Sequence, residues 1–87
     1  MTANTPDEIL RTITAIAVAE TGIPEADLRP DVDLRAMAGV DSVRVLRMVA
    51  KIERAYDIEL EDEAVFGMAT LDDVVAVVDS ELRQAAA

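Results

Sequence analysis

The sequence contains no cysteine and no histidine. It can therefore form no disulfide, and it lacks the commonest zinc ligands, so we expect no metal site. Tryptophan is also absent, and Tyr56 and Phe66 are the only aromatic residues. The core must be built from aliphatic side chains and methionine. A chain of 87 residues forms one small domain, which depends on that core for its stability.

Basic residues are scarce, with 8 against 18 acidic residues and a net charge of −10. A nucleic-acid-binding protein needs a cationic surface that displaces counterions, so this class is disfavoured. Binding to anionic membranes is disfavoured for the same reason. Two explanations of the acidic charge remain open. It either attracts cationic partners or only keeps the protein in solution.

Long apolar runs are missing as well. No segment approaches the roughly 20 apolar residues that a membrane-spanning helix needs. The first ten residues, "MTANTPDEIL", lack the basic start of a secretory signal. We therefore expect a protein that works in the cytoplasm, and we separately expect it to be a monomer.

The first two predicted helices have clear start signals. Thr5 is a suitable N-cap and Pro6 suits the first helical position, so a helix should run from there to Gly22. The second helix is predicted over residues 42–56, with Asp41 as its N-cap. The long connection between them, 23–40, should lie on the core with one helical turn at 24–28, and a loop of this length is often functional.

Two further helices complete the prediction. A short third helix is predicted over residues 62–67, capped by Asp62, and a fourth starts at Thr70 in the capping pattern "TLDD". The run "VVAVV" could form a strand, but no partner strand or hairpin signal accompanies it. We expect an all-α four-helix bundle forming one domain over 1–87. Its core should span about 6–82, with a frayed tail at 83–87.

The second predicted helix has two unlike faces. At about 100° per residue, its apolar side chains fill one arc and its basic side chains form a stripe opposite. The arc holds Val45, Leu46, Met48, Val49, Ile52 and Tyr56, and the stripe holds Arg44, Arg47, Lys51 and Arg54. With four basic residues and one acidic residue, segment 42–56 carries +3, whereas the rest of the chain, with four basic and seventeen acidic, carries −13.

Ser42 stands at the predicted start of this helix. A serine nucleophile needs a nearby general base, usually histidine, which this chain lacks. The segment "GVDSV" at 39–43 also lacks the second glycine of a nucleophile elbow, so a serine hydrolase is disfavoured. An acid–base pair of carboxylates stays open on residue types alone. A helix start also favours an anion, so a phosphate on the Ser42 hydroxyl would be stabilised there. Alternatively, Asp41 and Ser42 only cap the helix.

The order of these features resembles the acyl carrier protein family over roughly residues 6–82. Leu34 in the long connection matches that family, as does "GVDSV" at the start of the second helix. The aliphatic positions Leu46, Val49 and Ile52, the segment "ERAYDIEL" at 53–60, "DE" at 62–63 and "MATLDDVVAVV" at 68–78 are similar to the family pattern too.

This resemblance implies a role for Ser42. In the family, a separate phosphopantetheinyl transferase moves 4′-phosphopantetheine from coenzyme A onto the equivalent serine, with a metal held near the preceding acid, which Asp41 matches. The arm ends in a thiol that carries acyl groups as thioesters, so the carrier itself is not an enzyme. The other implied partners are enzymes that load, transfer or condense acyl groups. A bundle of this kind could shelter an acyl chain between its helices.

Two departures from the family pattern concern the choice of partners. Val43 stands where leucine or isoleucine usually follows the serine. The second helix of a fatty-acid-synthesis carrier is typically acidic, whereas this one carries Arg44, Arg47 and Lys51. The stripe is either a solvated face or a docking surface for partners with acidic or apolar patches. Met68 matches a family position near the arm and the partner surface.

The predicted function is a discrete acyl carrier of a specialised pathway, such as polyketide, lipopeptide or nonribosomal peptide synthesis. One alternative is a peptidyl or aminoacyl carrier. Another is an unmodified helical interaction module in which Ser42 only caps its helix. The residues identify neither the cargo nor the pathway.

Overall fold

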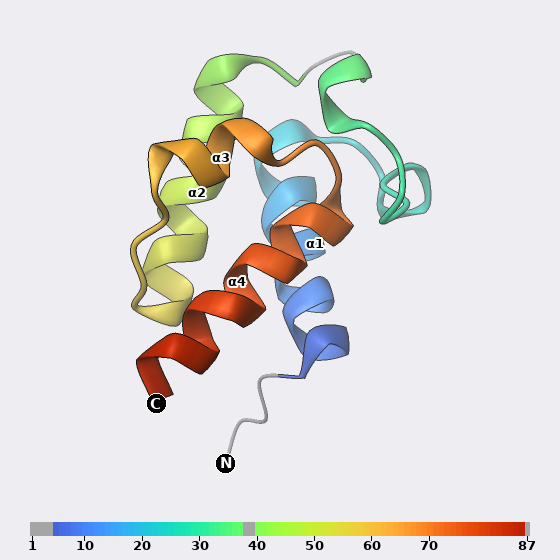
Figure 1. The fold of residues 1–87 in the computed structure, drawn as a ribbon. Coiled ribbons are helices and arrows are strands. Elements are labelled where there is room, and N and C mark those ends of the chain that lie inside the picture. Colours follow the sequence, from blue (N-terminus) through green and yellow to red (C-terminus); the bar gives the residue numbers. More distant parts are fainter. Residues whose placement is uncertain (1–4, 38–39, 87) are drawn as a thin grey trace.

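The computed structural model describes residues 5–37 and 40–86, which form four α-helices and contain no strand (Figure 1). The helices are α1 (Pro6–Thr21), α2 (Ser42–Tyr56), α3 (Asp62–Gly67) and α4 (Leu71–Ala86), and two short 3₁₀ turns, η1 (Glu25–Asp27) and η2 (Leu34–Ala36), lie between α1 and α2. The predicted all-α fold, with three longer helices and a short third one, is confirmed. Gly39 of the "GVDSV" pattern lies outside the described residues.

The ends of the first two helices follow local side-chain chemistry. The Thr5 hydroxyl accepts a hydrogen bond from the Glu8 N–H at 3.3 Å, which caps α1. This helix ends at Gly22, whose φ of +74° costs little without a Cβ. Asp41 caps α2 by accepting the Arg44 N–H at 2.8 Å. The predicted start and end of α2 are confirmed.

The later helices agree with the prediction except at two ends. The Thr70 hydroxyl accepts the Asp73 N–H at 3.1 Å, and the Asp73 carboxylate accepts the N–H of Thr70 at 3.1 Å, so the predicted capping pattern forms. Glu61, and not Asp62, is the N-cap residue of α3, because Asp62 is already helical. The structure continues α4 to Ala86, where a frayed end was expected. Alanine, glutamine and arginine are good helix formers, which favours this continuation.

The core is aliphatic, as the scarcity of aromatic residues predicts. Ile9, Ile13, Leu71 and Val78 are the largest fully buried side chains of the described residues, and they join α1 to α4. Met48 and Ile52 bring α2 into the same core. Burying each such side chain contributes about 1.5–3 kcal/mol relative to exposing it.

The long connection is tied to the rest of the bundle. Leu28 and Leu34 are buried in the core, and the predicted turn near 24–28 appears as η1, whereas η2 was not predicted. The Leu34 N–H donates to the Ala69 carbonyl at 2.9 Å, and the Asp72 N–H donates to the Pro30 carbonyl at 3.0 Å. The connection is therefore bonded at two points, to the segment that joins α3 to α4 and to the first turn of α4.

The arrangement places the start of α2 at one end of the molecule. In Figure 1 the beginning of α1 and the end of α4 lie at the other end, and α3 crosses near the upper half of α2. Among the described residues, the helices are all too short or too polar to span a membrane.

Candidate functional site

Ser42 is the first residue of α2 and is exposed to solvent. The preceding residue, Asp41, is also exposed and holds the helix start through its bond to the Arg44 N–H. The first N–H groups of an α-helix have no intrahelical carbonyl partner, so the first turn of α2 favours a negatively charged group. The predicted placement of the serine at a helix start, with an acid beside it, is observed.

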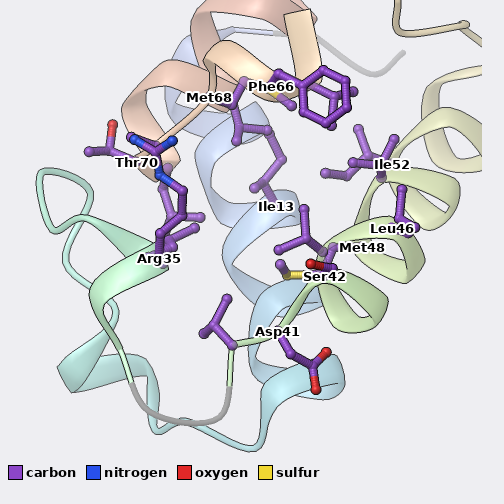
Figure 2. A pocket seen from close by; sticks show the side chains of 18 residues that line it. Ile13, Arg35, Asp41, Ser42, Leu46, Met48, Ile52, Phe66, Met68 and Thr70 are labelled. Atoms are coloured by element: carbon purple, nitrogen blue, oxygen red, sulfur yellow. The ribbon is translucent and has the colours of Figure 1, made fainter. Parts of the chain in front are cut away.

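Ser42 also stands at the mouth of a cavity of about 580 Å³ (Figure 2). All four helices and η2 contribute to its walls. Ile13, Met48, Ile52 and Val74 supply a buried aliphatic interior. A cavity of this size and polarity is in the range of small-molecule sites, and it suits an apolar chain.

One side of this cavity is unexpectedly open to water. Leu46 and Phe66 line the cavity, yet 63% of Leu46 and 79% of Phe66 is exposed. The helical wheel places Leu46 in the apolar arc of α2, but this side chain lies at the edge of the arc, outside the buried core. Figure 2 shows Phe66 and Leu46 on the side of the cavity where Ile52 lies, with Arg35 and Thr70 on the other side.

The basic stripe of α2 contacts an acidic residue of α1. This pairing was not predicted from the sequence. Glu20, in the last turn of α1, has a buried side chain, and its carboxylate lies 3.2 Å from the Arg47 guanidinium. Lys51 forms a second ion pair with the same carboxylate. Arg44 donates a hydrogen bond to the Glu20 backbone carbonyl. Three members of the stripe therefore converge on Glu20, although Arg47 and Lys51 remain at least half exposed.

This cluster has a clear electrostatic consequence. The hydrogen bond from Lys51 lowers the pKa of Glu20 below its ordinary value, against the opposing effect of burial, and the charges of Arg47, Lys51 and Arg44 lower it further. The last turn of α1 contains no basic residue of its own. Cations from α2 therefore complement the negative end of the α1 dipole as well as the Glu20 carboxylate.

A local pattern could have pointed to Glu20. It continues the helical spacing of the buried positions Ile9, Ile13 and Ala17 on α1, so its side chain must turn inward. A carboxylate at an inward position requires a cation or hydrogen-bond donors. The sequence offers the stripe on α2 as one source, but the pairing joins separate helices and has no local signal.

Of the remaining residues singled out in the sequence, Val43 and Met68 lie near Ser42, whereas Arg54 lies at the other end of α2. Val43 is 64% exposed and faces a smaller recess that Arg44, Arg47 and Glu20 also line. Met68 is half-buried at the end of α3 and lines the main cavity. Arg54 is exposed near the end of α2. Ser42 therefore has the cavity on its α3 side and the basic residues on its α1 side.

The comparison with protein families identifies the family to which the chain belongs. Residues 11–78, a range that contains Ser42, match the model of the family described as "Phosphopantetheine attachment site". The chain belongs to this family. Its members carry 4′-phosphopantetheine as a covalently attached group, so the predicted cofactor is confirmed at the level of the family.

Individual relatives agree with this assignment to the phosphopantetheine attachment family. An acyl carrier protein of Prochlorococcus marinus (strain MIT 9515) is 29% identical over 75 residues, which cover 86% of this chain and 94% of the relative. A solved structure of an acyl carrier protein from Enterococcus faecalis has the same fold, with a TM-score of 0.74 and 21% identity over 88% of this chain and 98% of that chain. The resemblance to acyl carrier proteins and their helical bundle is thus confirmed.

Proposed function

We propose that Ser42 is the attachment site of the phosphopantetheine arm, and that the chain carries acyl intermediates without catalysing a reaction itself. One observation carries this proposal. Ser42 is an exposed hydroxyl that stands both at the first position of a 15-residue helix and at the mouth of an aliphatic cavity. The helix start suits the phosphate of the arm, and the cavity suits an apolar acyl chain.

The attachment step belongs to a phosphopantetheinyl transferase. The Ser42 Oγ forms a bond to the phosphorus next to pantetheine in coenzyme A while the pyrophosphate bond breaks. The hydroxyl proton passes to a base of the transferase, and adenosine 3′,5′-bisphosphate leaves. Asp41 offers an exposed carboxylate beside the reacting oxygen, where it could contact the transferase's metal. When bound, the arm supplies a thiol that holds an acyl group as a thioester.

A mass measurement tests the attachment site. We would incubate the protein with coenzyme A and a broad-specificity transferase and weigh it intact. We expect a gain of one phosphopantetheinyl group in the wild type and no gain in Ser42→Ala. Ser80, the other serine of the chain, is exposed on α4 and provides the matched control Ser80→Ala, which should gain the same mass as the wild type. A gain that persists in Ser42→Ala would refute the assignment.

We also propose that the carrier serves a specialised pathway, such as polyketide, lipopeptide or nonribosomal peptide synthesis. The support is the basic charge of α2, because Arg47 and Arg54 are exposed on the helix that begins at Ser42. Such a surface attracts partner enzymes with acidic patches and repels enzymes whose docking patches are cationic. The proposal places the carrier in the cytoplasm, as a monomer that meets its loading and condensing enzymes in turn.

The test of the pathway proposal must leave the contact between α2 and Glu20 intact. Arg54→Glu reverses one charge of the stripe away from Glu20, and Arg83→Glu reverses an exposed charge on α4 as a control. We expect Arg54→Glu to slow loading by the enzymes encoded beside this chain's gene, mainly through KM, and Arg83→Glu to leave it unchanged. Equal loading rates in the two variants would show that the stripe is only solvated surface.

A further inference from the structure

A second groove lies between the middle of α1 and the last turns of α2. Within the described residues, it shares none of its lining side chains with the cavity beside Ser42. Its apolar lining residues are Ala15, Ile16 and Ala55, of which the two alanines are exposed. Side chains this small leave the space between the helices open, so an apolar group from another molecule can cover them favourably.

The polar residues along this groove are cationic, apart from Thr12. Arg11 lies on the α1 side, and Lys51 and Arg54 lie on the α2 side. Among the described residues, no acidic side chain lines the groove, although the chain has 18 acidic residues and only 8 basic ones. The groove is therefore a cationic surface on an anionic molecule, and it attracts negatively charged groups.

Two of these cations keep their charge available for another molecule. Lys51 is already bound to Glu20. Arg11 and Arg54, in contrast, are exposed and form no ion pair with any residue in the described part of the chain. Asp7 stands one helical turn before Arg11, at a spacing suited to an ion pair, yet the two do not pair. Carboxylates of another molecule would complement both arginines.

We propose that the groove between α1 and α2 is a docking site for an acidic amphipathic helix of a partner protein. A helix fits because two helices bound the groove, and the side chains of a third helix can pack between them. Apolar side chains of the partner, spaced at i and i+4, cover the apolar lining. Carboxylates on both flanks of that helix then meet Arg11 and Arg54.

The charge of the whole molecule favours a narrow partner such as a helix. With a net charge of −10, the chain is repelled by broad anionic surfaces such as membranes and nucleic acids. The groove also lies away from the attachment serine. Lys51 follows Ser42 by nine residues, or roughly 14 Å along the helix axis. A helix docked there leaves the serine and its cavity accessible to an enzyme.

A synthetic peptide tests this proposal on the chain without its arm, so the outcome does not depend on modification of Ser42. The probe is a helix-forming peptide with leucines at i and i+4 and glutamates on both flanks. One control peptide carries lysines in place of the glutamates, and another has the same composition in scrambled order. In NMR spectra of the isotope-labelled protein, we expect only the acidic amphipathic peptide to cause saturable shifts, centred on the amides of residues 11–16 and 51–55.

Variants assign the binding to the groove. We expect Arg11→Glu and Ala15→Gln to weaken binding several-fold, because the first reverses a cation and the second fills the groove. Arg29→Glu in the long connection and Ala76→Gln on α4 make the same changes elsewhere and should bind like the wild type. All four positions are exposed, and circular dichroism would verify that each variant folds.

Several results would overturn the proposal. One is unchanged affinity in Arg11→Glu and Ala15→Gln. Another is equal binding of the scrambled peptide, which would show attraction by charge alone. Shifts centred on Arg44 and Arg47 would place the acidic helix near Ser42 instead. A dimer whose formation shifts the groove amides would assign the groove to a second copy of this chain. None of these results would affect the attachment site, which the mass measurement tests separately.

Discussion

The two sides of α2 are held in different ways. On the side of α1, Arg44, Arg47 and Lys51 converge on the buried Glu20. On the side of α3, the helix borders an aliphatic cavity whose outer wall stands in water. Charged contacts depend on geometry and fix the relative positions of two helices, whereas an incompletely filled apolar contact tolerates rearrangement. The comparison indicates that α2 is fixed to α1 and adaptable toward α3.

The largest effect on the free energy of unfolding is expected when either of two core isoleucines is truncated to alanine. The difference between the two losses tests whether the cavity side of α2 is packed more loosely. Ile9 is fully buried away from the cavity, whereas Ile52 is 3% exposed but lines it. Truncation to alanine in a core costs about 2–5 kcal/mol. We expect the loss of stability to be near the upper end of this range for Ile9→Ala and near the lower end for Ile52→Ala, because Ile52 already borders empty space. Urea unfolding of both variants measures this, and equal losses would mean that the cavity is not a region of weaker packing.

The next largest effect on stability is expected at the charged contact between α2 and Glu20 of α1. Glu20→Gln removes the charge to which Arg47 and Lys51 bind, so we expect a lower Tm at pH 7. The folded pKa of Glu20 is lowered, so its stabilisation is complete above the ordinary carboxyl pKa of about 4.3 and is lost as the pH falls through the folded pKa. The Tm difference between wild type and variant should therefore shrink below about pH 4.3.

The control for this experiment is Glu25→Gln, at an exposed position in η1. This variant should show almost no difference in Tm at any pH. If Glu20→Gln behaves like Glu25→Gln, the ion pairs do not hold α2 to α1.

A smaller loss of stability is expected when the N-cap of α2 is removed. Asp41→Ala removes the carboxylate that accepts the Arg44 N–H at 2.8 Å and should cost about 0.5–2 kcal/mol. Asp41→Asn keeps an acceptor at the same place and should cost less. Thermal unfolding of the two variants compares them directly, and equal losses would argue against a capping role.

The smallest expected change in the free energy of unfolding distinguishes Arg54 from the members of the basic stripe that contact Glu20. Arg54→Gln should change the free energy of unfolding by less than about 0.5 kcal/mol, as is usual for an exposed residue outside such a cluster. Arg47→Gln should cost more, because it leaves the buried carboxylate with fewer cations. Denaturant unfolding at low and high salt sharpens this contrast, since salt screens the exposed residue most.

Local chemistry made much of this structure predictable. Asp41 and Ser42 mark the start of α2 because a short acidic side chain before a helix can accept an N–H of its first turn. The pairing of Thr70 with Asp73 marks the start of α4 in the same way. The position of Ser42 followed from such signals, and the resemblance to acyl carrier proteins predicted the function that we propose for it.

Contacts between distant segments could not be predicted in this way. Glu20 and its α2 partners are adjacent only after the helices have packed, and no spacing in the sequence records their contact. Leu46 belongs to the apolar arc of α2, but whether the edge of that arc meets a neighbour or a cavity depends on where α3 lies. The helical pattern predicts which face is apolar, not how completely the face is covered.

Two backbone hydrogen bonds restrain the long connection between α1 and α2. The bonds from the Leu34 N–H to the Ala69 carbonyl and from the Asp72 N–H to the Pro30 carbonyl join this connection, whose η2 turn lines the cavity, to the α3–α4 segment and the first turn of α4. These two amide protons should exchange slowly with deuterated water, while the amides of α3 exchange quickly. The long connection then serves as a fixed reference frame for spectroscopic labels, against which the motion of a loaded carrier could be followed.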